Sequence, residues 1–313
     1  MEQPLVSILI PVYNREKYIE KALQSACEQS YRNIEIIAID NHSTDTTWEI
    51  LEQWQQKDPR IHCYRNEKNI GPVLNWKRGL ERAKGKYVKI LWSDDWMAPE
   101  FIEEAVKFFD DQTAFLLSPV QIVNNEMETL GTISFLRSSY STGEFLDDVL
   151  FTRNIPFPVS PGAALFRLED TRNSFIAEIP NDDNLDSKKN GAGNDLLFYL
   201  ITASKYKTIK ILPFCGNYFR YHAESFSVKN NLEIYYEWAR LFFIRNYHYR
   251  ISRLSWLKVY YFILLHIRSR ADYKTIYSSL HYTPSGIGWV VYYTFVKCFL
   301  KIKRLFLFRD KTF

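Results

Sequence analysis

The sequence predicts an α/β fold with a mostly parallel central sheet flanked by helices. Over the first 125 residues, short runs rich in β-branched residues alternate with segments of helical periodicity, the order typical of a parallel sheet. Polar turns follow several predicted strands, and ligands of such sheets bind outside the carboxyl ends of the strands. The chain has 313 residues, 46% of them hydrophobic, which is enough for one large domain with an appendage.

The predicted elements of the first half follow one another at regular spacing. We expect strands at Leu5–Ile10, Ile34–Ile39, Ile61–Tyr64, Lys86–Leu91 and Ala114–Val123. We expect helices between them at Glu16–Glu28, 46–54, Pro72–Ala83 and 99–109. Thr46 and Glu49 have the spacing of a capping box at the start of the second helix. Residues 126–190 are less regular, a helix and a strand are expected at 194–204 and 208–212, and the pattern from residue 231 onward is helical.

Charge is distributed unevenly along the chain. Residues 232–313 hold 14 Lys and Arg against 4 Asp and Glu, whereas residues 1–231 hold 26 against 32. A basic, aromatic tail on an acidic body predicts contact with an anionic partner. No apolar stretch of the tail reaches the roughly 20 residues that cross a bilayer. Helices lying on an anionic membrane surface are therefore favoured over nucleic-acid binding, for which no motif is present, and packing on the domain is the alternative.

The cysteines point to a reducing compartment. Cys27, Cys63, Cys215 and Cys298 are scattered, without the spacing of a metal site. Such cysteines are typical of packing residues in the cytoplasm. The first residues lead directly into a predicted strand, so we expect no signal peptide.

Two adjacent carboxylates follow the fourth predicted strand, in the sequence Ser93-Asp94-Asp95. Neighbouring like charges disfavour each other's ionised form. A Mg²⁺ or Mn²⁺ ion with a bound phosphate removes that cost, and both ions prefer oxygen ligands. The motif therefore predicts an enzyme that uses a nucleotide and a metal. Because no GxGxxG follows the first strand, a dinucleotide-dependent oxidoreductase is not favoured.

Seven short motifs stand in an order that resembles the family 2 glycosyltransferases of the GT-A fold, as found in bacterial surface polysaccharide synthesis. They are Ser7–Asn14, Ile39–Asp45, Asn69–Pro72, Ala83–Tyr87, Ser93–Asp95, Asn194–Leu196 and Tyr218–His222. The resemblance covers roughly residues 4–228. It implies a GT-A domain over residues 1–230, with a nucleotide-binding half to about 125 and an acceptor half from about 126, followed by the helical extension 231–313.

The resemblance also implies a donor site and a metal site. The donor contacts are expected from Pro11, Tyr13, Asn14, Asp40, Asn41, Asn69, Asn75, Lys77, Ser93, Asp94 and Arg220. Among these, Asp40 is expected to accept a hydrogen bond from the uracil N–H; a residue of the turn before a helix is the alternative. Asp95 is expected to ligate Mn²⁺ or Mg²⁺, with His222 completing the metal shell.

The chain departs from the family pattern at three positions. Asn41 and His42 stand where the family usually has Asp and Gly, and His lacks the tolerance of glycine for positive φ. Trp92 stands where the family often has another Asp, so fewer carboxylates are available to a metal.

Asp195 is the implied general base, which takes the proton of the acceptor hydroxyl. A helix cap is the alternative role, and Asp182, Asp183 and Asp186 are rival bases. The implied reaction is inverting transfer from a nucleotide-sugar, with UDP favoured, to a hydroxyl of a glycan or polyprenyl-linked oligosaccharide at the inner face of the cell membrane. Since Trp92 and Asn41 replace carboxylates, an inactive nucleotide-sugar or carbohydrate-binding module is the alternative function.

Overall fold

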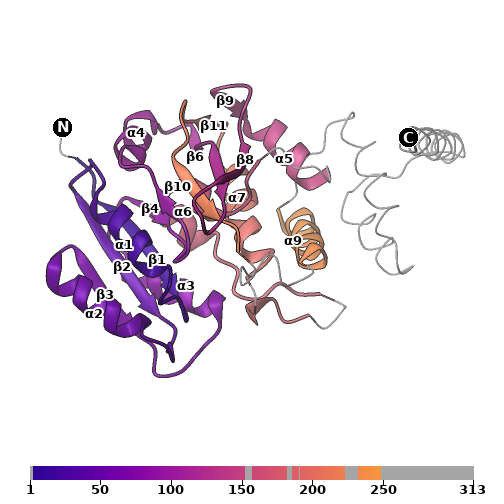
Figure 1. The fold of residues 1–313 in the computed structure, drawn as a ribbon. Helices are drawn as coiled ribbons and strands as arrows, with labels where there is room; N and C mark the ends of the chain where they lie inside the picture. The colour runs from indigo at the N-terminus through magenta and orange to yellow at the C-terminus, as the bar shows by residue number, and fades with distance from the viewer. Residues whose placement is uncertain (1–2, 152–156, 182–184, 190, 223–231, 248–313) are drawn as a thin grey trace, which may run out of the picture. The chain divides into compact units, whose positions relative to one another are not determined.

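An eight-stranded mixed sheet forms the centre of the protein (Figure 1). The computed structural model describes residues 3–151, 157–181, 185–189, 191–222 and 232–247. In sheet order the strands are β3 (Ile61–Arg65), β2 (Ile34–Asp40), β1 (Val6–Val12), β4 (Tyr87–Ile90), β10 (Ala164–Arg167), β6 (Thr113–Leu117), β11 (Thr208–Ile211) and β9 (Ser139–Ser141). The first four are parallel, and β10 runs antiparallel between β4 and β6. The predicted central sheet flanked by helices is confirmed.

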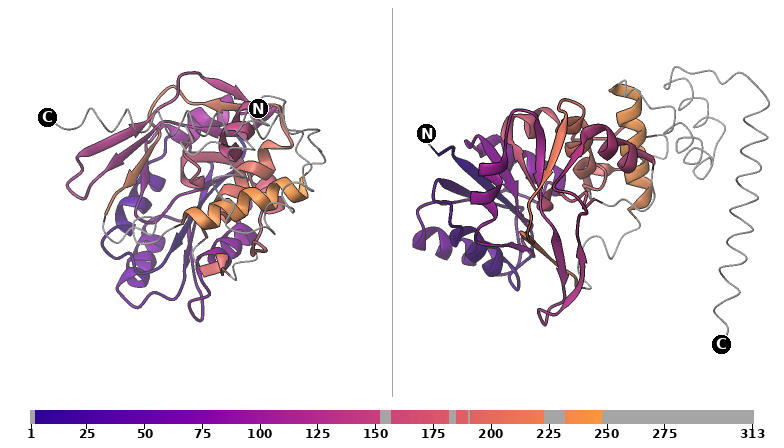
Figure 2. Two further views of the ribbon diagram at one scale, coloured as in Figure 1. Left: turned by 90° about the vertical axis from the view of Figure 1, so that its right-hand side faces the viewer. Right: turned by 90° about the horizontal axis from the view of Figure 1, so that it is seen from above.

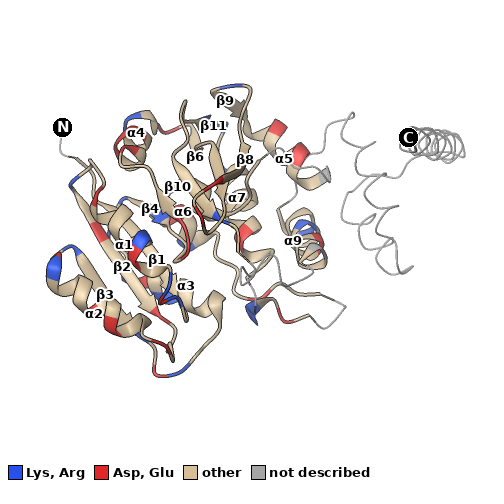
Figure 3. Ribbon diagram, viewed as in Figure 1, with Lys and Arg blue, Asp and Glu red and all other residues tan. Residues whose placement is uncertain are grey.

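Helices cover both faces of this sheet. On one face lie α1 (Ile19–Cys27), α2 (Thr47–Lys57) and α4 (Phe101–Phe108). On the other lie α3 (Pro72–Arg82), α6 (Leu168–Asn173) and α7 (Asn194–Ala203). Two further helices, α5 (Thr142–Phe151) and α9 (Glu233–Asn246), pack against α7. Figure 3 shows most charged residues on helices and loops around the strands.

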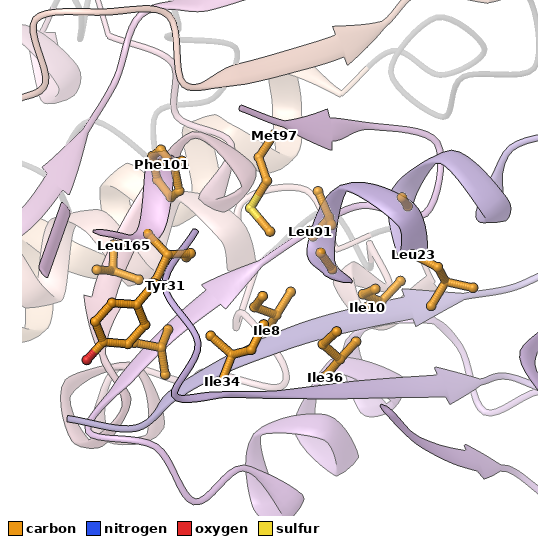
Figure 4. Packing of buried hydrophobic residues seen from close by; sticks show 14 of the residues in the cluster. Ile8, Ile10, Leu23, Tyr31, Ile34, Ile36, Leu91, Met97, Phe101 and Leu165 are labelled. Atoms are coloured by element: carbon orange, nitrogen blue, oxygen red, sulfur yellow. The ribbon is translucent and has the colours of Figure 1, made fainter. Parts of the chain in front are cut away.

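Alternate residues of the central strands build the core on the α1 face. Ile8 and Ile10 of β1 and Ile34 and Ile36 of β2 pack with Leu23 of α1 (Figure 4). Because neighbouring side chains of a strand point to opposite faces, the intervening residues pack under α3. Every residue of β1 and β2 is buried, as expected for parallel strands covered on both sides.

A second, smaller sheet corrects the prediction of one strand over Ala114–Val123. The strand order is β5-β12-β7-β8, with β5 (Trp96–Met97), β12 (Asn217–Arg220), β7 (Val120–Val123) and β8 (Thr129–Ile133). The predicted strand breaks at Ser118-Pro119, since proline has no N–H for a ladder. The Ser118 hydroxyl instead accepts hydrogen bonds from the β12 region, at 3.2 Å from the Gly216 N–H and 2.7 Å from the Asn217 side chain.

The predicted capping box at Thr46 is also wrong. Thr46 donates its N–H and its hydroxyl to one carboxylate oxygen of Glu16, at 3.0 and 2.7 Å. Glu16 belongs to the loop after β1, so this contact joins the first two loops at the carboxyl edge of the sheet. Those loops carry much of the candidate site.

α9, the first helix of the predicted extension 231–313, belongs to the same compact unit as the two sheets. α9 packs closely against Gly193, the residue that precedes α7. Gly193 has φ +83°, and a Cβ there would lie 2.6 Å from the carbonyl oxygen of Tyr235, so only glycine allows this contact. Residues 248–313 lie outside the described part, so membrane contact by the tail stays a prediction. Within the described part, no helix is long and apolar enough to cross a membrane.

Arg172 of α6 holds the carboxyl end of α3. Its guanidinium donates to the carbonyl oxygen of Leu80 at 3.0 and 2.8 Å and to that of Ala83 at 2.6 Å. We expect Arg172→Met to lower the free energy of unfolding by about 1–3 kcal/mol, because these carbonyls lose a charged donor. Urea denaturation measures the change. The control is Lys77→Met on α3, where the side chain is 52% exposed and a change within about 0.5 kcal/mol is expected.

Candidate active site

A cavity of about 1030 Å³ opens where β1, β2 and β4 end. Its size is that of a site for a small-molecule ligand. It is lined by the loops after these strands, the first turn of α3, residues between 186 and 195, β12 and α9. Ten predicted site residues line this cavity: Pro11, Tyr13, Asn41, Asn69, Asn75, Ser93, Asp94, Asp95, Asp195 and Arg220.

The acidic pair is enclosed by cationic groups from two distant segments. Arg15, in the loop after β1, lies 3.6 Å from the Asp94 carboxylate. His222 Nε2 lies 3.1 Å from the same carboxylate. The Arg220 backbone N–H donates to Asp95 at 2.8 Å, and its Nε donates to the Asp94 carbonyl at 3.2 Å. The small sheet thus brings β12 onto the pair, with Tyr218 opposite Trp96.

The two carboxylates have opposite pKa shifts. Burial and then the negative charge of Asp94 raise the pKa of Asp95 well above its usual range. Burial acts on Asp94 as well, but the hydrogen bond with His222 and the charge of Arg15 lower the pKa of Asp94. Burial and the charge of Asp94 therefore oppose the ionised form of Asp95, and an added cation would favour it.

This arrangement suits a hard divalent cation that arrives with phosphate. No cluster of three or more His, Cys, Asp or Glu is preformed among the described residues. Mg²⁺ and similar ions commonly use one or two carboxylates together with phosphate oxygens of the substrate. Asp95, buried beside Asp94 and lining the cavity, is placed for such a role.

Four predicted site residues lie outside the cavity lining: Asn14, Asp40, Lys77 and His222. Asp40 is fully buried, and its oxygens accept from the Ser43 N–H and hydroxyl and from Arg65 at 3.2 Å. Lys77 is exposed beside Glu81. His222 is buried behind Asp94, and Asn14 bonds with Thr44. Asp40 and Lys77 are therefore not among the residues that line the cavity, and their donor contacts stay predictions.

A buried asparagine network explains one departure from the family pattern. Asn41 donates to Asn69 at 2.9 Å and accepts from Asn66 at 2.9 Å and from the Ile70 N–H at 3.0 Å. Asn66 also donates to Asn75 at 2.8 Å. A carboxylate at position 41 has no proton to donate, so the amide serves where an Asp could not.

His42 adopts the conformation that the sequence suggested it would resist. It has φ +66°, and its Nδ1 lies 3.1 Å from the Asn66 carbonyl oxygen. The hydrogen bond offsets part of the backbone cost of a positive φ.

Trp92 fills the place of the missing carboxylate with an aromatic wall. Its indole N–H donates to the Ser160 hydroxyl at 2.8 Å, and its ring lies 5.2 Å from that of Trp76 on α3. Gly162 packs against Trp92 and Gly191 against Trp76 so closely that a Cβ at either glycine would collide. Both rings line the cavity.

Asp195 lies in the first turn of α7 and lines the cavity together with the acidic pair. Its Oδ1 accepts from the Leu196 N–H at 2.8 Å, and its Oδ2 accepts from the Tyr236 hydroxyl at 3.0 Å. Burial raises the pKa of Asp195 to about 7, although these hydrogen bonds act in the opposite direction. Among its rivals, Asp186 also lines the cavity, whereas Asp182 and Asp183 lie outside the described residues.

Residues 7–171, more than half of the chain, match the family model for Glycosyl transferase family 2. The chain belongs to this family. Over 111 residues it is 39% identical to TuaG of Bacillus subtilis, which is named for teichuronic acid biosynthesis; the match covers 36% of this chain and 44% of that one. Over 130 residues it is 35% identical to Escherichia coli WfaP, a UDP-Glc:α-D-GlcNAc-diphosphoundecaprenol β-1,3-glucosyltransferase, covering 42% and 51%.

The fold is similar to that of S. aureus TarS in complex with UDP-GlcNAc. The TM-score is 0.62 at 20% identity, over 88% of this chain and 79% of that one. At this identity the likeness concerns the fold, which is GT-A. The chain spans about half or less of the length of the two relatives above, so the family and the fold are established for this chain and its substrates are a separate question.

Several residues of the site were missed by the sequence reasoning. Arg15 directly follows a predicted motif, so a cation in that loop could have been matched to the acidic pair. Trp76 and Tyr236 carry no such signal, because their positions depend on how α3 and α9 pack. Lys89 of β4 was also missed: it is fully buried, donates to Asn217 at 2.7 Å, and burial lowers its pKa to about 7 against the charge of Asp95.

We expect Asn41→Asp, which restores the usual family residue, to destabilise this protein. The new carboxylate cannot donate to Asn69 and lies next to buried Asp40, which costs about 1–3 kcal/mol. Its pKa should be raised in the folded state, so the loss should be larger at pH 8 than at pH 5, where it is protonated and can donate. Urea denaturation at both pH values tests this, with exposed Asn33→Asp as the control. A loss independent of pH contradicts the explanation.

Proposed function

We propose that this chain is an inverting glycosyltransferase that moves a sugar from a nucleotide-sugar to a hydroxyl of a glycan or lipid-linked oligosaccharide in surface polysaccharide synthesis. The observation that carries the proposal is that one cavity contains both the acidic pair and Asp195. The pair can receive a diphosphate together with a cation, and Asp195 can receive a proton.

The proposed reaction is a single displacement. The acceptor hydroxyl gives its proton to Asp195 as its oxygen forms a bond to the anomeric carbon. The bond from that carbon to the diphosphate oxygen breaks, and the nucleoside diphosphate leaves with the electron pair. Arg220 and Arg15 supply positive charge near the leaving group. Asp95, with help from Asp94, would hold a divalent cation, which would supply Lewis-acid neutralisation of the diphosphate.

A UDP-sugar is the proposed donor, and a polyprenyl-linked oligosaccharide is the proposed acceptor. UDP-GlcNAc is bound by the structural neighbour TarS, and WfaP is named for a UDP-Glc donor and a diphosphoundecaprenol-linked acceptor. The uracil contact expected of Asp40 has less support, since that carboxylate is occupied by Ser43 and Arg65. Asn41, Asn69 and Asn75 line the cavity and are the proposed contacts for the nucleoside. A lipid-linked acceptor would place the reaction at the inner face of the cell membrane.

We expect Asp195→Asn to lose turnover by about 10²–10⁴-fold while it still binds the donor. In the wild type, the rate at low substrate should fall about tenfold per pH unit below pH 7, because the pKa of Asp195 is raised to about 7 and only its ionised form accepts a proton. Release of nucleoside diphosphate from sugar nucleotides measures both. Asp111→Asn on the surface is the control. If the wild type binds donors without turnover, the chain is a binding module.

We expect Asp95→Asn to abolish the metal-dependent part of donor binding. Thermal shift with UDP, with and without Mn²⁺, measures it, since a ligand at about 100 times its Kd adds roughly 2.7 kcal/mol of stability. The variant alone should be at least as stable as the wild type, because it removes a buried carboxylate next to Asp94. An unchanged response to Mn²⁺ in this variant contradicts the role assigned to Asp95.

A further inference from the structure

The final described helix reaches the candidate site. α9, drawn in orange in Figure 2, lies alongside the body formed by the two sheets and packs on α7. Tyr236 of α9 lines the same cavity as Asp195, although the two residues are 41 positions apart in the chain. The family match ends at residue 171, so α9 lies outside it.

The two oxygens of Asp195 are held by different elements. The Leu196 N–H of α7 donates to Oδ1, and the Tyr236 hydroxyl of α9 donates to Oδ2. Together with further backbone hydrogen bonds, these two donors fix the orientation of the carboxylate. Burial and the charge of Asp195 raise the pKa of Tyr236 well above its usual range, so Tyr236 remains a donor at neutral pH.

Contacts of α9 with its neighbours fix the position of Tyr236. The backbone carbonyl of Tyr235 approaches Gly193 so closely that a Cβ at residue 193 would lie 2.6 Å from it. One turn further along α9, buried Arg240 donates from Nε to the Val149 carbonyl of α5 at 2.9 Å. Contacts on both sides of Tyr236 therefore hold α9 against α5 and α7.

We propose that Tyr236 is a positioning residue for the candidate base: its hydroxyl holds the Asp195 carboxylate in the orientation that receives the acceptor proton, which makes α9 part of the active site. This inference rests on the proposed role of Asp195. Without the hydroxyl, the Asp195 carboxylate keeps only backbone N–H donors, so its rotation about the χ2 bond is less restricted.

Other ionisable groups on the elements around Asp195 define what else could influence its titration. They are Tyr199 on α7; Glu237, Arg240 and Arg245 on α9; Glu144, Asp147 and Asp148 on α5; Glu169, Asp170 and Arg172 on α6; Asp186, Lys188 and Lys189 near 3₁₀ helix η2 (Ser187–Lys189); and Arg15, Asp94, Asp95 and Arg220 across the cavity. The pKa of Asp195 is set chiefly by burial, and then by Tyr236 and backbone N–H groups.

The test is the pH dependence of turnover in Tyr236→Phe, with Tyr235→Phe on the same helix as the matched control. Loss of a donor to the ionised carboxylate should move the acidic limb of the profile upward by about one pH unit, and leave UDP binding by thermal shift unchanged. Tyr235→Phe should superimpose on the wild type. A Tyr236→Phe profile that superimposes on the wild type overturns the proposal.

A second substitution strengthens the hydrogen-bond donor at position 236, whereas Tyr236→Phe removes it. Replacement of Tyr236 by 3-fluorotyrosine keeps the ring and the hydroxyl but makes the hydroxyl a stronger donor, so the acidic limb should move to lower pH. If Tyr236→Phe does not fold, the 3-fluorotyrosine variant provides the test. An acidic limb that stays at the wild-type pH in that variant overturns the proposal. Asp195→Asn separates the two hypotheses: if it retains turnover, the proposed base is wrong; if it is inactive while the Tyr236 variants show no shift, only the role of Tyr236 is wrong.

Discussion

The placement of two adjacent carboxylates in a buried position is the constraint on which the rest of the site depends. Asp94 and Asp95 emerge after β4 at the carboxyl edge of the sheet, where water cannot fully solvate them. Their charge is opposed by groups from the loop after β1 and from β12. The small sheet brings the second of these segments to the pair. The charge balance of the acidic pair therefore depends on the smaller sheet.

The departures from the family pattern follow from their surroundings. Asn41 both donates and accepts within a buried network, which a carboxylate could do only when protonated. His42 accepts a positive φ and gains a contact with the Asn66 carbonyl. Trp92 exchanges a charge for an aromatic surface next to Trp76, so this part of the cavity presents rings rather than anions. These changes are mutually consistent adaptations of one site, and none of them removes Asp95 or Asp195.

The amino-terminal part of the central sheet could be predicted from local patterns because β1, β2 and β4 are buried along their whole length and alternate with amphipathic helices. The meeting of the polar motifs at one edge of the sheet could also be predicted, since parallel strands present their carboxyl ends at a common edge. Prediction failed where tertiary contacts decide. Ser118-Pro119 divides a continuous apolar run between two sheets, and Thr46 finds Glu16 from another loop in place of its local partner. The ion pair between Asp40 and Arg65 of the next strand likewise depends on tertiary packing and carries no local sequence signal.

The close fit between α9 and Gly193 has a consequence for how this protein can diversify. A helix outside the family-matched segment supplies a hydroxyl to Asp195, so under the proposed function changes in that helix would shift the pH dependence of turnover and leave the residues proposed to bind the nucleoside unchanged. Chimeras that join this GT-A core to a foreign carboxyl-terminal region should accordingly place the junction beyond residue 247. The core then keeps its own α9 and the contacts between them.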